Sequence, residues 1–203
     1  MTARRRIPLW LKLGYGVATP AIALAYARTY GPQNFLWLSD VALGLTAVAA
    51  VAESPLAASL AAVGALPLEL AWNLDFLAGG KPFGLAGYMF DAKLPRFLRA
   101  LSLFHVALPP SLILLLRRLG YDRRAFPMQA ALTALLLPAS RKASNPRENV
   151  NWAFGPGERP QRRISPGLYL GLEILAFVLL AHLPTHLALR RLFPAAPRPG
   201  RRA

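Results

Sequence analysis

Long apolar stretches, separated by short polar clusters, dominate the sequence. A helix needs about 20 mostly apolar residues to cross a bilayer. Six stretches come close to this length, so the pattern predicts an all-α, polytopic transmembrane helix bundle. The number of spans falls to five if the short segment 125–139 or the N-terminal segment does not cross. The predicted helices cover residues 7–27, 35–52, 56–77, 96–116, 125–139 and 166–193.

These helices predict one transmembrane domain over residues 1–193, with an ordered loop at 140–165 and a disordered basic tail at 194–203. The first stretch has a second interpretation as a secretory signal peptide, because three arginines precede it and an Ala-Tyr-Ala sequence follows it. We expect it to be retained as the first helix.

Prolines and small polar residues predict where the helices turn or bend. Only Glu53, Ser54 and Pro55 separate the second and third stretches, which predicts a tight helical hairpin with proline opening the returning helix. Pro109-Pro110 predicts a kink in the fourth helix.

The charge of the chain is strongly positive, with 24 Lys and Arg against nine Asp and Glu and a net charge of +15. The basic residues lie in short clusters between apolar stretches, a pattern that favours contact with lipid phosphates over binding to nucleic acid. We therefore predict an integral protein of a bacterial-type plasma (inner) membrane whose partners are membrane lipids, and no nucleic-acid partner. The cations divide almost equally between the two predicted sides, which gives only a small preference for an inside N-terminus. The chain has no cysteine, which excludes disulfides and thiolate metal ligands.

Ionisable residues within apolar helices are expensive and are candidates for function. Glu69 and Asn73 share one face of the third helix, and His105 lies in the fourth. At a rise of about 1.5 Å per residue, Glu69 and His105 both lie roughly 12–14 Å from the same surface, so they can meet as a buried pair. Such a pair is either a proton relay or general acid/base pair, or a static hydrogen bond that fixes the order of the helices.

The last helix contains His182 and His186, one turn apart on the same face. This spacing suits a zinc or iron ion, which would supply a metal-bound water as nucleophile. A third ligand from His105 would have to cover a difference in depth of about one to two helical turns. The alternative is structural: Pro184 frees the carbonyl of Leu180, and His182 or a neighbouring group satisfies it.

The spacing of these two histidines resembles one element of the seven-helix zinc hydrolases related to alkaline ceramidases and adiponectin receptors. That group combines an HxxxH in its last helix with an earlier Ser-x-x-x-His and a helical Asp. Here Ser102 and His105 are one residue closer together, Asp122 lies in a basic turn, and fewer helices are predicted. The chain is therefore not assigned to that group.

A long loop near residues 145–155 offers a different kind of site. Trp152 can seat at the membrane interface while Arg147, Asn149 and Asn151 bind a lipid or glycan headgroup. The alternative is an interfacial turn that the asparagines stabilise by capping.

The sequence therefore predicts a membrane-embedded enzyme that acts on a lipid or other hydrophobic substrate by acid/base or metal-assisted chemistry. Two alternatives belong to other classes. One is an accessory subunit that packs against other subunits of a larger membrane complex, and the other is a small transporter.

Overall fold

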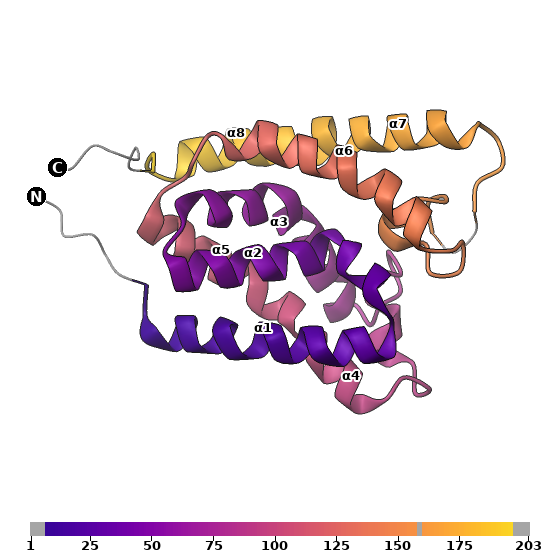
Figure 1. The fold of residues 1–203 in the computed structure, drawn as a ribbon, viewed down its shortest axis with the longest axis horizontal. Coiled ribbons are helices and arrows are strands. Elements are labelled where there is room, and N and C mark those ends of the chain that lie inside the picture. The colour runs from indigo at the N-terminus through magenta and orange to yellow at the C-terminus, as the bar shows by residue number, and fades with distance from the viewer. Residues whose placement is uncertain (1–6, 158–159, 197–203) are drawn as a thin grey trace, which may run out of the picture.

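The computed structural model describes residues 7–157 and 160–196, and within them the chain is all-α, with no strand (Figure 1). All six predicted segments contain helix. Short 3₁₀ turns lie at Pro32–Leu36 (η1), Gly87–Phe90 (η2) and Val150–Trp152 (η3). The helices are α1 (Leu9–Thr29), α2 (Leu38–Ala52), α3 (Pro55–Leu77), α4 (Arg96–Leu101), α5 (Phe104–Leu119), α6 (Ala125–Ala143), α7 (Pro166–Ala176) and α8 (Leu183–Leu192).

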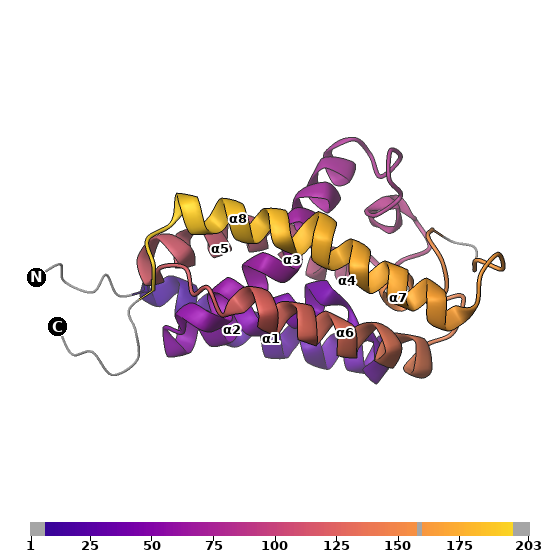
Figure 2. The same cartoon turned by 90° about the horizontal axis from the view of Figure 1, so that it is seen from above.

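Helix α3 occupies the centre and packs against α2, α5, α6 and α8. It is rich in alanine, and Gly64 lets the side chain of Gln129 lie directly against its backbone. Helices α6 and α7–α8 lie side by side along one face of α3, as Figure 2 shows from above. We call the end of the bundle with the start of α1 and the end of α8 the N-terminal end, and the opposite end the loop end (Figure 1).

Three helical segments in the described part are long and apolar enough to cross a membrane: Pro55–Leu77, Arg96–Leu119 and Pro166–Leu192. Helix α2 is apolar but has only 15 residues. In Pro166–Leu192, only 6% of the most apolar 18-residue stretch is buried within the protein. Its apolar side chains therefore face outward, as expected of a helix surrounded by lipid.

The predicted hairpin between α2 and α3 is confirmed. Glu53 ends α2 in the left-handed conformation, with φ 51°, and the Ser54 hydroxyl accepts a hydrogen bond from the backbone N–H of Ala57. The Glu53 carboxylate also accepts hydrogen bonds from the Lys12 ammonium (2.7 Å) and from the backbone N–H of Ile7. These contacts bind the start of α1 to the hairpin.

The helix predicted over residues 96–116 is interrupted at a place other than the predicted kink at Pro109-Pro110. Helix α5 runs unbroken through both prolines, and the interruption lies at Ser102–Leu103, where α4 ends and α5 begins. Residues 103, 105 and 106 donate their backbone N–H groups to carbonyls three residues earlier, which tightens the chain there. Pro109 has no N–H to donate to the carbonyl of His105. The interruption at Ser102–Leu103 therefore lies just before the first carbonyl that the prolines leave without a helical donor.

The last helix changes its winding before Pro184. Residues Phe177–His182 (η4) form a π-helical turn that joins α7 to α8, and the N–H of Leu183 donates to the carbonyl of Val178, five residues back. A π turn adds one residue to the winding and is one way in which a helix accommodates an interruption.

The predicted disordered tail begins at Pro194, but residues 194–196 form a short bridge with Tyr121. The N–H of Tyr121 donates to the carbonyl of Pro194, and the N–H of Ala196 donates to that of Tyr121. Residues 197–203 lie outside the described residues.

Candidate functional site

The predicted contact between Glu69 and His105 is confirmed. The imidazole Nδ1 of His105 lies 2.8 Å from the carboxylate Oε2 of Glu69, between α3 and α5. The Glu69 side chain is 2% exposed and that of His105 is 12% exposed. A carboxylate at Nδ1 selects the tautomer that carries its proton there, which leaves Nε2 as the basic nitrogen.

Asn73, one turn along α3 from Glu69, holds the backbone beneath His105. Its side-chain amide donates to the carbonyl of Glu69 (2.7 Å) and to the carbonyl of His105 (2.9 Å). In an unbroken helix the N–H of residue 109 would donate to His105, but Pro109 has no N–H. Asn73 supplies the missing donor, so α3 fixes both the side chain and the backbone of His105.

Aromatic rings enclose the imidazole. The indole of Trp72 stacks on it with ring centroids 4.5 Å apart, and the ring of Phe104 stacks at 4.0 Å. Among the residues that the structure describes, none forms a hydrogen bond with Nε2 of His105. The geometry can therefore support a general base that is oriented at one nitrogen and open at the other.

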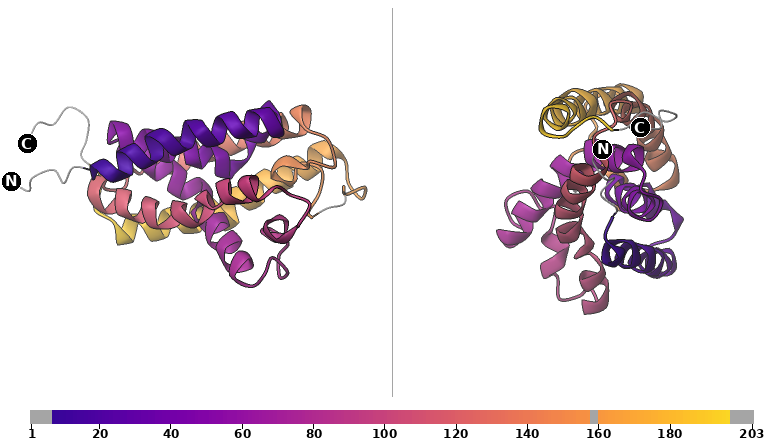
Figure 3. Two further views of the ribbon diagram at one scale, coloured as in Figure 1. Left: turned by 90° about the horizontal axis from the view of Figure 1, so that it is seen from below. Right: turned by 90° about the vertical axis from the view of Figure 1, so that its left-hand side faces the viewer.

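A mostly apolar cleft of about 450 Å³ runs between α1 and the α4–α5 segment. Figure 3 (right), which looks along the bundle, shows these helices as separate arms on the side away from α7–α8. Phe104 contributes to its wall and also stacks on His105, so this ring stands between the cleft and the imidazole. The other lining residues are Trp10, Leu11, Gly14, Tyr15, Ala18, Ala21, Ile22, Leu43, Ala100, Leu101, Leu103, Ala107 and Ser111.

His182 and His186 have separate partners. In His182, Nδ1 donates to the carbonyl of Val63 (3.1 Å) and Nε2 accepts from the hydroxyl of Thr133 (2.9 Å). His186 places Nδ1 2.6 Å from the hydroxyl of Tyr121. The described residues hold no group of three or more His, Cys, Asp or Glu side chains placed for a metal ion. The zinc or iron hypothesis therefore has no third ligand in this part of the chain.

The structural role of His182 differs from the predicted one. The sequence indicated the Leu180 carbonyl, freed by Pro184, as its partner. Instead His182 serves the Val63 carbonyl of α3, which lacks its helical donor because residue 67 is proline. Two polar side chains, the half-buried Asn73 and the buried His182, thus satisfy carbonyls that prolines have freed on neighbouring helices.

The loop at 145–155 uses its asparagines within the protein. The Asn149 amide donates to the carbonyls of Gly155 and Gly157 and accepts from the N–H of Phe154. Trp152 is half-buried, with its ring near those of Trp37 and Phe177, and Arg147 is exposed. The headgroup role predicted for Asn149, Asn151 and Trp152 thus competes with internal contacts, and of the four predicted residues only Arg147 is exposed.

Asn151 connects this loop to two helices. Its side-chain oxygen accepts from the N–H of Leu38, at the start of α2, and its amide nitrogen donates to the carbonyl of Leu36 and the hydroxyl of Ser140. It is buried and adopts a left-handed backbone, with φ 52°, which asparagine tolerates better than most residues.

Asn151→Ala should lower the free energy of unfolding by about 2–3 kcal/mol, because it leaves buried groups on α2 and α6 without partners. The measurement is unfolding by a denaturing detergent, monitored by circular dichroism. Asn145→Ala is the control: this exposed residue also bonds within the loop, and it should cost less than 1 kcal/mol. Equal losses in the two variants would contradict the role given to Asn151.

The sequence placed Asn73 on the same helix face as Glu69 but did not predict its contact with the His105 carbonyl, and it did not indicate Trp72 as part of the site. A signal for Asn73 exists, because a proline four residues after a buried position predicts an unpaired carbonyl there. The stacking of Trp72 has no such signal.

Comparison with family models, with curated proteins and with solved structures finds no match to this chain.

Proposed function

We propose that this chain is a polytopic membrane protein that acts on a lipid or another hydrophobic substrate. In this proposal His105 is the general base, Glu69 orients it, and the apolar part of the substrate lies in the cleft between α1 and α4–α5. The observation that carries the proposal is the 2.8 Å contact between Glu69 and His105 Nδ1, one aromatic ring away from the cleft.

Several features support the membrane setting. Three helical segments have the length and hydropathy of spans, and α1, α2 and α6 pack alongside them in the same bundle. Two carbonyls that prolines free within helices, those of Val63 and His105, accept hydrogen bonds from polar side chains of neighbouring helices. Such replacement is favourable where no water can take the place of a lost backbone hydrogen bond. We propose that all six helical segments cross one bilayer, with the first and last described residues on the same side.

The test is lipid turnover by the purified chain in vesicles of mixed phospholipids, followed by mass spectrometry of the extracted lipids. Glu69→Gln should reduce turnover about 100-fold or more while the protein stays folded, because the base loses its orienting charge. His105→Gln should reduce turnover at least as much. Glu173→Gln, which changes a carboxylate on α7, is the matched control and should keep turnover near that of the natural chain.

Two results would contradict this proposal. One is the absence of any lipid turnover by the folded natural chain in all the vesicle compositions. The other is unchanged turnover in Glu69→Gln.

A second candidate function is that of an accessory subunit, and the outer face of α7–α8 favours it. That face is apolar and almost wholly exposed, and Gly167 and Gly171 leave open space where a partner helix can approach closely. Absence of turnover, together with co-purification of other membrane subunits that is lost on Gly171→Leu, would favour this candidate.

A further inference from the structure

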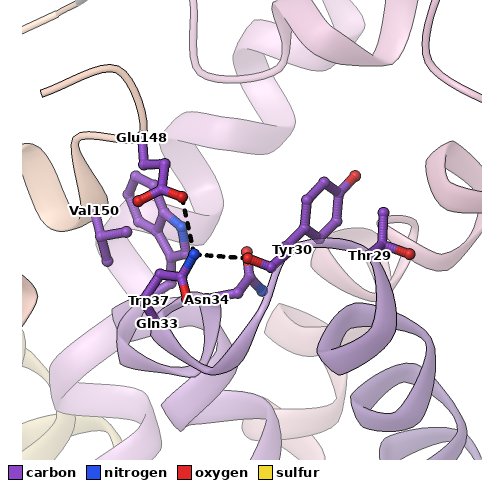
Figure 4. Close-up of a pocket in the computed structure, with 7 residues that line it drawn as sticks. All are labelled: Thr29, Tyr30, Gln33, Asn34, Trp37, Glu148 and Val150. Carbon is purple, nitrogen blue, oxygen red and sulfur yellow. Dashed lines mark hydrogen bonds between the residues drawn. The ribbon is translucent and has the colours of Figure 1, made fainter. Parts of the chain in front are cut away.

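A pocket of about 290 Å³ opens at the loop end and shares no lining residue with the cleft (Figure 4). It lies between the end of α1, the η1 turn and the loop after α6. Figure 4 shows Glu148, Trp37 and Val150 on one side of the Gln33 side chain and Tyr30 on the other. The lining residues are Thr29, Tyr30, Gln33, Asn34, Trp37, Glu148 and Val150.

Glu148 is the only ionised group in the wall of this pocket. Its Oε1 accepts a hydrogen bond from the Gln33 amide (2.8 Å), which also donates to the carbonyl of Tyr30, and its Oε2 accepts from the N–H of Asn145. These contacts hold the carboxylate in place without neutralising it. No lysine, arginine or histidine of the described residues forms an ion pair with Glu148, although cations far outnumber acids in the chain.

Two aromatic residues complete the wall, and both rings are held by neighbours. Tyr30 packs edge-on against Tyr26, with centroids 5.4 Å apart, and Trp37 packs edge-on against Trp152 at 6.4 Å. Aromatic rings attract ammonium groups through their quadrupoles, and a nearby carboxylate adds a full negative charge. The combination selects a cation with apolar substituents over a hydrated metal ion, which prefers several oxygen ligands.

We propose that this pocket binds an alkylammonium group, as in a choline or ethanolamine headgroup or in a free amine of the same chemistry. Its volume lies at the lower end for small-molecule sites and suits a group of this size rather than a whole lipid. Its aromatic residues lie at one end of the bundle, where tyrosine and tryptophan gather at the level of lipid headgroups. The inference depends on this pocket alone and stands or falls separately from catalysis at His105.

The experiment titrates choline chloride into the full chain, purified in a detergent without amine groups, and follows binding by isothermal titration calorimetry. Saturable binding is expected, with Glu148→Gln at least 10-fold weaker and Trp37→Leu weaker by a similar factor. Glu173→Gln removes a carboxylate outside the pocket and should bind as the natural chain does. Should Glu148→Gln not fold, Trp37→Leu provides the same test.

The neutral isostere of choline, 3,3-dimethylbutan-1-ol, separates charge recognition from simple filling of space and should bind at least 10-fold more weakly. Short-chain phosphatidylcholine, compared with phosphatidylglycerol, identifies the source of the ammonium group. Preference for phosphatidylcholine supports a lipid headgroup, and tighter binding of free choline supports a soluble amine. Equal affinity for choline and the isostere, or no saturable binding of either choline or phosphatidylcholine, would overturn the inference.

Discussion

His182→Leu should lower the free energy of unfolding by about 2–3 kcal/mol, and Pro67→Ala should recover about half of that loss. His182 is fully buried and uses both ring nitrogens, one for the Val63 carbonyl and one for the Thr133 hydroxyl. Leucine has a similar size but offers neither bond. The cost of the substitution is therefore that of leaving buried polar groups unpaired, rather than that of a cavity.

The recovery by Pro67→Ala follows from the geometry of the α-helix. The Val63 carbonyl has no helical partner because residue 67 lacks an N–H, and alanine restores it. With His182 present, the restored bond adds little, because the carbonyl already has a donor. In the His182→Leu background it replaces the missing donor, so the gain should be larger there by about 1–2 kcal/mol.

The measurement is a double-mutant cycle, with unfolding by a denaturing detergent in mixed micelles. Pro138→Ala is the matched control. The Ala134 carbonyl, four residues before this proline, lies at an exposed position and receives no side-chain hydrogen bond from the described residues. The change in the free energy of unfolding caused by Pro138→Ala should be the same with His182 and with Leu at position 182. An equal gain from Pro67→Ala in both backgrounds would contradict the role given to His182.

The helices could be predicted from the sequence because the length of an apolar stretch is a one-dimensional property. The contact between Glu69 and His105 was also within reach, because depth in a helix follows from residue number alone. The partner of His182 was not. The sequence shows that both Pro67 and Pro184 free a carbonyl, but the rotation and height of the η4 turn relative to α3 decide which carbonyl His182 meets.

The partners of the loop asparagines could not be predicted from the sequence either. The asparagines indicated an ordered segment. The side-chain oxygen and amide group of asparagine can, however, bind either a ligand or the backbone at the start of a helix. Only the position of the loop beside α2 shows that the Asn151 oxygen accepts from the Leu38 N–H. The pocket around Glu148 likewise joins residues about 115 positions apart, a separation that no local pattern reveals.

Asn73→Leu should lower the free energy of unfolding by about 1–3 kcal/mol and should also reduce lipid turnover about 10-fold or more. The substitution leaves the His105 carbonyl without a donor, because Pro109 has none to offer. Asn73 lies one turn from Glu69 on α3, and its bond to α5 keeps the His105 backbone in register with Glu69. The substitution removes this constraint. A base that is displaced by even a fraction of its hydrogen-bond length loses much of its effect.

Pro109→Ala separates these two consequences of losing Asn73. It gives the His105 carbonyl a helical donor, so it should recover most of the lost stability in the Asn73→Leu background and much less in the natural chain. It does not restore the contact from α3, so turnover should remain low. Recovery of turnover together with stability would show that Asn73 only stabilises the fold. Low turnover in a stable protein would show that α3 must hold the His105 backbone, as well as its imidazole, for the base to work.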